Sequence, residues 1–127
     1  MLLKKIHLEL ARDPDFPNGS RHHGYEFLAP LDKDRHIDPA GWKKVREKCR
    51  VHRFWGDAEK EIGHLIRKPG GSWAFHYDIH GDEDDDETGH RFDAEVFETG
   101  EYVSIMEHDD VMRTFRVTRV TDAVGVG

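Results

Sequence analysis

Short segments in which apolar and polar residues alternate limit the fold of this chain more than any other feature. In residues 4–10, isoleucine and leucine occupy every second position, and lysine, histidine and glutamate lie between them. Residues 72–80 repeat the pattern with Trp73, Phe75 and Tyr77. Because successive side chains of a strand point to opposite faces, a period of two predicts strands with one buried face. We expect the aromatic face of the second segment to supply much of the core.

Turn-forming residues separate such segments along the whole chain, for example at 69–71 and 99–100. The expected strands are 4–10, 24–31, 51–55, 61–68, 72–80, 90–98, 101–107 and 112–120. Strands and helices do not alternate, so the sequence predicts a mainly β chain with one helix, folded as a small antiparallel β-barrel or rolled sheet of seven to eight short strands. Residues 1–127 then form a single β-rich domain, in which 121–127 are expected to fray.

The one expected helix runs from Asp38 to about Cys49. Asp38 can cap the free N–H groups of a first turn, and Pro39 suits the first helical position. Trp42, Val45 and Cys49 then share an apolar face. The chain has a single cysteine, so it cannot form an internal disulfide, and we expect a buried and inert thiol.

The composition of the chain limits the classes of protein to which it can belong. The chain of 127 residues is long enough for one core, and its aromatic content of 10% argues against disorder. A net charge of -7 argues against nucleic acid or an anionic membrane as the main partner. Ten histidines make the chain histidine-rich and its charge sensitive to acid. With no signal sequence, no apolar membrane span and one cysteine, a cytoplasmic location is expected.

One strand face carries the residues best suited to bind a metal. His76, Asp78 and His80 alternate and therefore share a face, and His90 follows across a hairpin. Imidazole and carboxylate groups are common ligands of divalent metals, so these four residues are the predicted metal site. The competing interpretation is a solvent-facing strand surface, which alternation alone would produce. No motif identifies a catalytic residue or an organic cofactor.

Two charged segments suggest partners. The acidic segment 82–87 lacks the spacing of a calcium loop, so it is expected to be a solvated connection. The basic segment 43–53, with Trp42 and Trp55 beside it, has the interleaved basic and aromatic residues that bind single-stranded nucleic acid. A solvated helix face has the same composition, and the acidic net charge disfavours nucleic acid. A third possibility is pairing of the basic with the acidic segment, within one chain or across a homodimer.

Four segments resemble parts of short uncharacterised bacterial proteins of unknown function: Arg21–Asp32, Gly70–Asp78, Gly100–Ile105 and Thr114–Val120. This resemblance implies a bacterial cytoplasmic protein and transfers no functional residue. Residues 97–105 also resemble the closing hairpin of many small β-barrels, including cupin-like and PUA-like ones. A cupin-like protein would carry a clustered His-x-His followed by Glu, whereas Asp78 stands between His76 and His80 here.

These features together predict a small soluble β-barrel that is a binding or interaction module more readily than an enzyme. The first alternative is a cupin-like metal-binding protein or metal-dependent enzyme that uses the strand face of His76, Asp78 and His80. The second alternative is a nucleic-acid-binding protein that uses segment 43–53.

Overall fold

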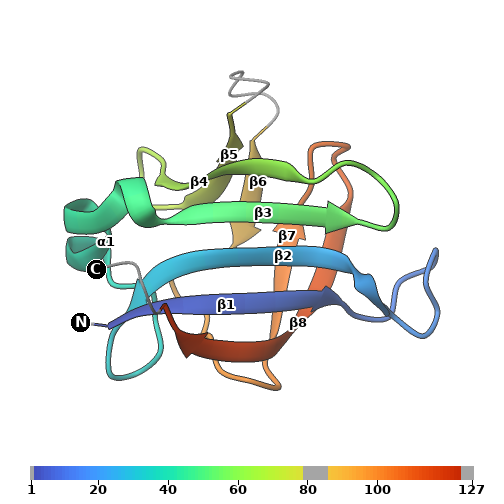
Figure 1. Cartoon of the computed structure of the whole chain (residues 1–127), viewed down its shortest axis with the longest axis horizontal. Coiled ribbons are helices and arrows are strands. Elements are labelled where there is room, and N and C mark those ends of the chain that lie inside the picture. Colours follow the sequence, from blue (N-terminus) through green and yellow to red (C-terminus); the bar gives the residue numbers. More distant parts are fainter. Residues whose placement is uncertain (1, 79–85, 124–127) are drawn as a thin grey trace.

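The computed structural model describes residues 2–78 and 86–123, and its eight strands close into one barrel (Figure 1). Each strand runs antiparallel to its neighbours in sequence, and the last pairs with the first. The elements are β1 Leu2–Leu10, β2 Ser20–Leu31, α1 Pro39–Val45, the short 3-10 helix η1 Arg46–Lys48, β3 Arg50–Trp55, β4 Glu61–Arg67, β5 Trp73–Tyr77, β6 Glu87–His90, β7 Tyr102–Met106 and β8 Met112–Asp122. The prediction of a mainly β chain with one α-helix and an antiparallel barrel is confirmed.

Closure depends on the pairing of β1 with both β2 and β8. Ile6 lies opposite Phe27 on one side and opposite Val120 on the other. Each of the eight strands therefore pairs along both of its edges. A barrel that closes in this way has no unpaired strand edges, which are the edges through which sheets associate.

Aromatic rings fill the middle of the barrel. Trp73, Phe75 and Tyr77 of β5 are all buried, as their alternation predicts. Tyr25 and Phe27 of β2 pack against the ring of Phe75, with centroid separations of 5.3 and 5.2 Å. An eight-stranded barrel has an interior just wide enough to be filled by side chains, and these rings fill it.

Helix α1 lies at one end of the barrel, beside the start of β1 and the end of β8 (Figure 1). Asp38 caps it as predicted, accepting hydrogen bonds from two backbone N–H groups of the first turn. The α-helix ends at Val45 and not at Cys49, because residues 46–48 tighten into a 3-10 turn. Cys49 then enters the core and is fully buried. No helix in the described part of the chain is long and apolar enough to cross a membrane.

The strand predicted at 90–98 does not form. β6 ends where that segment should begin, and the next residue, Arg91, has a φ of 55°, which is incompatible with a continuing strand. The chain then folds back, so that the ring of Phe92 lies on Gly89, where an added Cβ would come within 2.4 Å of it. Phe92 and Phe97 are both buried, and the centroids of their rings are 5.1 Å apart. Their insertion into the core, and not strand alternation, explains the apolar positions of this segment.

Candidate functional site

Two of the four predicted metal ligands can be placed. His76 lies on β5, where its Nδ1 is 2.6 Å from Asp86 Oδ1. Asp78 follows the strand and lies 3.0 Å from a ring nitrogen of a β4 histidine. His80 and the side chain of His90 fall outside the described part of the chain, within which no three histidine, cysteine or acidic side chains are grouped to hold a metal. The metal site therefore stays a prediction.

The acidic segment 82–87, expected to be solvated, is buried at its described end. The Asp86 side chain is only 2% exposed, and its Oδ2 lies 3.1 Å from Lys68 Nζ. Glu87 begins β6 at an inward-facing position and is fully buried. The prediction of a solvated connection is thus wrong for these two residues, and neither carboxylate is available for contact with a second copy. Residues 82–85 lie outside the described part of the chain.

Glu87 is the centre of a hydrogen-bond network near the end of the barrel opposite α1. Its Oε1 accepts hydrogen bonds from the hydroxyls of Tyr25 and Tyr77, at 2.8 and 2.5 Å. Its Oε2 accepts from the backbone N–H of His108 at 3.2 Å and lies 2.9 Å from the Nδ1 of that ring. Arg53 Nε is 3.5 Å from the same oxygen. Four hydrogen-bond partners therefore satisfy the two oxygens of this buried carboxylate.

A second buried carboxyl group, Glu107, lies on the other side of Tyr25. The Tyr25 hydroxyl oxygen is 2.5 Å from Glu107 Oε2, and Arg53 Nη2 is 3.2 Å from the same atom. Arg113 Nε lies 2.9 Å from Glu107 Oε1, without the geometry of a hydrogen bond. Burial raises the pKa of Glu107, and the charge of Glu87 adds to that rise, whereas Tyr25 and Arg53 oppose it.

Arg113 connects this network to the β1–β2 loop, which comprises residues 11–19. Its Nη1 is 2.8 Å from Oδ1 of Asp13, whose side chain is almost completely buried. The guanidinium carbons of Arg53 and Arg113 lie 4.2 and 5.5 Å from the ring centroid of Trp55, within the range of cation–π contacts. The polar end of the barrel and the loop beside it are therefore held by one set of charges.

The basic segment 43–53 is divided between the surface and the interior. Its last residue, Arg53, belongs to the buried network. Its exposed basic residues are Lys43, Lys44, Arg46, Arg50 and His52. Cys49 lies in the core as expected, where burial raises its pKa to about 12, so the reactive thiolate is scarce. Nucleic-acid binding by the exposed part of this segment stays a prediction.

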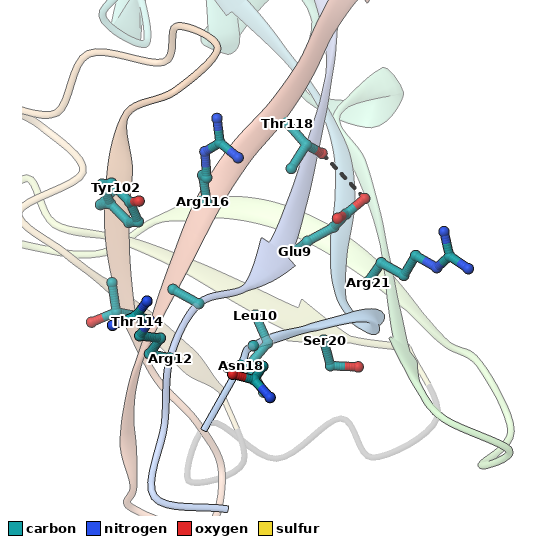
Figure 2. A pocket seen from close by; sticks show the side chains of 12 residues that line it. Glu9, Leu10, Arg12, Asn18, Ser20, Arg21, Tyr102, Thr114, Arg116 and Thr118 are labelled. Carbon is teal, nitrogen blue, oxygen red and sulfur yellow. Dashed lines mark hydrogen bonds between the residues drawn. The ribbon is translucent and has the colours of Figure 1, made fainter. Parts of the chain in front are cut away.

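The main surface feature near the β1–β2 loop is a groove of about 720 Å³ that borders β1, β7 and β8 (Figure 2). Irregular pairing shapes it: Glu9 pairs with Gly24, but Leu10 pairs with Ser20, so the start of β2 departs from the regular ladder. Such bulges bend a strand and redirect its side chains. Figure 2 shows the side chains of β1, β7, β8 and the loop around the resulting hollow.

Three arginines line this groove: Arg12, Arg21 and Arg116. All three are exposed, and none forms an ion pair with another residue in the described part of the chain. Glu9, a carboxylate that also lines the groove, is already engaged, because its Oε2 lies 3.2 Å from Nε2 of His7. The groove therefore carries an excess of positive charge on a chain whose net charge is -7.

An exposed aromatic ring stands beside these charges. Tyr102 is 57% exposed, and it lies opposite Arg116 in the β7–β8 pairing. Figure 2 shows the two side chains on adjacent strands at the same edge of the groove. The polar side chains that complete the lining are Asn18, Ser20, Thr114 and Thr118. A planar ring, guanidinium groups and neutral donors can together contact an anion that carries a ring.

Neither the groove nor the network was identified from the sequence. Arg12 and Arg21 lie at the two ends of the β1–β2 hairpin loop, and the closure of β1 against β8 brings the distant Arg116 beside them. One usable signal was the alternation in 115–118, which places Arg116 outward between buried Phe115 and Val117. Glu87 and Glu107 carried no comparable signal, since carboxylates next to turn residues are ordinarily on the surface.

Comparison with known proteins does not assign this chain to a family. No protein-family model, no curated protein and no solved structure matches it. A barrel architecture by itself does not determine a function, because one fold can carry many unrelated sites. The function must therefore be inferred from the groove and the network themselves.

Proposed function

We propose that this protein is a binding module that holds a ring-bearing anion, with the chemistry of a nucleoside phosphate, in the groove lined by Arg12, Arg116 and Tyr102. The observation that carries this proposal is the group of groove arginines without ion-pair partners among the described residues, beside an exposed ring. In contrast, Arg53 lies 3.5 Å from the buried carboxylate of Glu87, and Arg113 lies 2.8 Å from the carboxylate of Asp13. Positive charge left uncompensated on an acidic chain favours a bound anion.

The shape of the site suits a small ligand. Its volume of about 720 Å³ is within the range of small-molecule sites. A guanidinium group can donate two parallel hydrogen bonds to a phosphate, which fixes the orientation of the anion. Tyr102 offers a ring face on which a base can stack, a contact worth about 1–3 kcal/mol. Both contacts come from neighbouring positions on β7 and β8, so one ligand can use them together.

Isothermal titration calorimetry tests this proposal with four probes. Adenosine monophosphate should bind, more weakly at high salt, whereas inorganic phosphate and adenosine alone should each bind more weakly than the nucleotide. A short single-stranded oligonucleotide distinguishes the source of the chemistry: affinity no higher than that of the mononucleotide favours a free small ligand. The absence of binding by all four probes would overturn the proposal.

Matched variants localise the site. Arg116→Ala should weaken nucleotide binding about 10- to 100-fold, since hydrogen bonds to charged groups contribute about 1.5–3 kcal/mol. Tyr102→Ala should weaken binding, and Tyr102→Phe should restore it because the ring is kept. Arg119→Ala, on the same strand but outside the groove lining, is the control and should leave the affinity unchanged. An equal loss in the control would place the anion elsewhere.

A further inference from the structure

The buried network contains fewer protons than its hydrogen bonds require if all of its carboxyl groups are ionised. The hydroxyl oxygen of Tyr25 lies 2.8 Å from Glu87 Oε1 and 2.5 Å from Glu107 Oε2. A tyrosine hydroxyl has one proton, so it can donate to only one of these two oxygens. The second contact is a hydrogen bond only if a carboxyl group donates to the tyrosine. One of the two glutamates therefore carries a proton.

The surroundings of the two glutamates decide which one is protonated. Glu87 has a partner for each lone-pair direction, namely two tyrosine hydroxyls and the backbone and ring nitrogens of His108. With the ring proton of His108 on Nδ1, all four of these groups donate, an arrangement that suits an ionised carboxylate and leaves no place for a proton on it. Tyr25 then donates to Glu87, and Glu107 donates to Tyr25. Burial raises the pKa of both Glu107 and Tyr25, which is consistent with a proton on each.

Charge balance also favours one protonated acid in this network. Five of the described side chains at this end of the barrel are of types ordinarily charged at neutral pH and are at most 12% exposed: Arg53, Arg113, Asp13, Glu87 and Glu107. Two of them are cations and three are acids, so the group is neutral when one acid is protonated. An unbalanced charge in such a setting is costly, because burial removes its hydration.

The groups facing Glu107 come from every element around it. Tyr25 of β2, Arg53 of β3 and Arg113 of β8 contact its carboxyl oxygens directly. The groups in contact with these three residues are Asp13 and Asp15 of the β1–β2 loop, Glu61 of β4 and Glu87 of β6, and Glu87 in turn contacts Tyr77 of β5 and His108 of the β7–β8 turn. Arg113 is the residue of this network that also contacts the β1–β2 loop. It lies 2.9 Å from Glu107 and 2.8 Å from Asp13, which anchors the loop that lines the groove.

We propose that Glu107 is protonated in the folded protein at neutral pH, and that loss of this proton loosens the β1–β2 loop and weakens anion binding in the groove. The second half rests on the proposed function. An ionised Glu107 competes with Asp13 for Arg113, so the contact that fixes the loop weakens. The loop that this contact fixes supplies four positions of the groove lining: Ala11, Arg12, Asn18 and Gly19.

The sign of the pH dependence follows from linkage. Because the folded-state pKa of Glu107 is raised, the folded protein keeps a proton that the unfolded chain has lost. The stability due to this group therefore falls as the pH rises from the pKa of the unfolded chain, about 4.3, through the pKa of the folded protein. Glu107→Gln mimics the protonated acid and should remove this fall.

Infrared difference spectroscopy tests the protonation without any ligand. The wild-type protein at neutral pH should show the C=O stretch of a protonated carboxylic acid, and the band should disappear reversibly as the pH is raised. Glu107→Gln should lack the band. Glu61→Gln, which changes another acid paired with Arg53, is the control and should keep it. Absence of the band from the wild-type protein, or its persistence in Glu107→Gln, would overturn the assignment.

Titrations with adenosine monophosphate at several pH values test the coupling. Wild-type affinity should fall severalfold as the band disappears, and the affinity of Glu107→Gln should stay constant over the same range. A band that titrates while wild-type affinity stays constant would overturn the coupling and leave the binding function standing. No nucleotide binding at any pH would overturn the function and the coupling together, whereas the infrared band would still decide the protonation. A variant that fails to fold does not affect the wild-type pH titration.

Discussion

Replacement of Glu87 by glutamine should destabilise the barrel severely, although the two side chains have nearly the same shape. The carboxylate accepts hydrogen bonds at both oxygens, and Arg53 lies 3.5 Å from Oε2. An amide N–H in place of either oxygen would point a donor at a donor. It would also leave Arg53 without its ionised partner in the interior.

The size of the effect follows from comparable buried pairs. Removal of one partner of a buried ion pair costs about 3–5 kcal/mol. The total free energy of unfolding of a domain is about 5–15 kcal/mol, so the variant should lose a large fraction of it. For a domain of this length the loss corresponds to a fall in Tm of roughly 10–25 °C. Glu107→Gln should cost less, because an amide can replace a protonated acid as donor to Tyr25, and only the hydrogen bonds that Arg53 donates to Oε2 are then lost.

Urea unfolding followed by tryptophan fluorescence measures this difference. The midpoint for Glu87→Gln should fall well below that of the wild-type protein, with the slope unchanged. Glu101→Gln, on the exposed surface before β7, is the control and should stay within about 0.5 kcal/mol. If Glu87→Gln were as stable as the control and Glu107→Gln were not, the two protonation states would be exchanged and the reasoning above refuted.

Three further predictions concern other parts of the chain. Phe92→Ala should cost about 3–5 kcal/mol in thermal unfolding, because its buried ring packs on Gly89 and Phe97; a cost below about 1 kcal/mol would show that the ring does not close the core. Cys49 should react with thiol reagents only on unfolding, since it is buried with a pKa of about 12, and rapid reaction of the native protein would contradict this placement. Elemental analysis of untagged protein should find a divalent metal that the His76→Ala/His80→Ala variant loses if the predicted metal site exists; no metal under any loading condition would end that hypothesis.

The strands were predictable because their signal is local. Alternation in 4–10 and 72–80 reports a buried face directly, and the structure places Ile6, Leu8 and Phe75 in the core. The fold class follows from the number and spacing of such segments and the lack of intervening helices. Strand order and barrel closure were not predicted, although short connections favour pairing between consecutive antiparallel strands.

The segment around β6 could not be predicted in this way, since its structure depends on distant contacts. Glu87 lies in a run of carboxylates, and only the tyrosines of β2 and β5 and the turn at His108 make its burial favourable. Phe92 and Phe97 are five residues apart, which fits neither strand nor helix periodicity. The turn at Arg91, with its positive φ, places Phe92 on Gly89, and no pattern of apolar residues reveals that turn.

The content of the barrel interior explains why binding is expected on its outer surface. The rings of Tyr25 and Phe27 both contact the ring of Phe75 across the middle. An eight-stranded barrel has room for such side chains or for one small ligand, but not for both. A ligand site must then be built where strand irregularities open the outer face, as they do beside β1. Arg113 contacts both Glu107 in the interior and Asp13 in the loop beside that face. A proton buried in the barrel can therefore influence a ligand bound outside it.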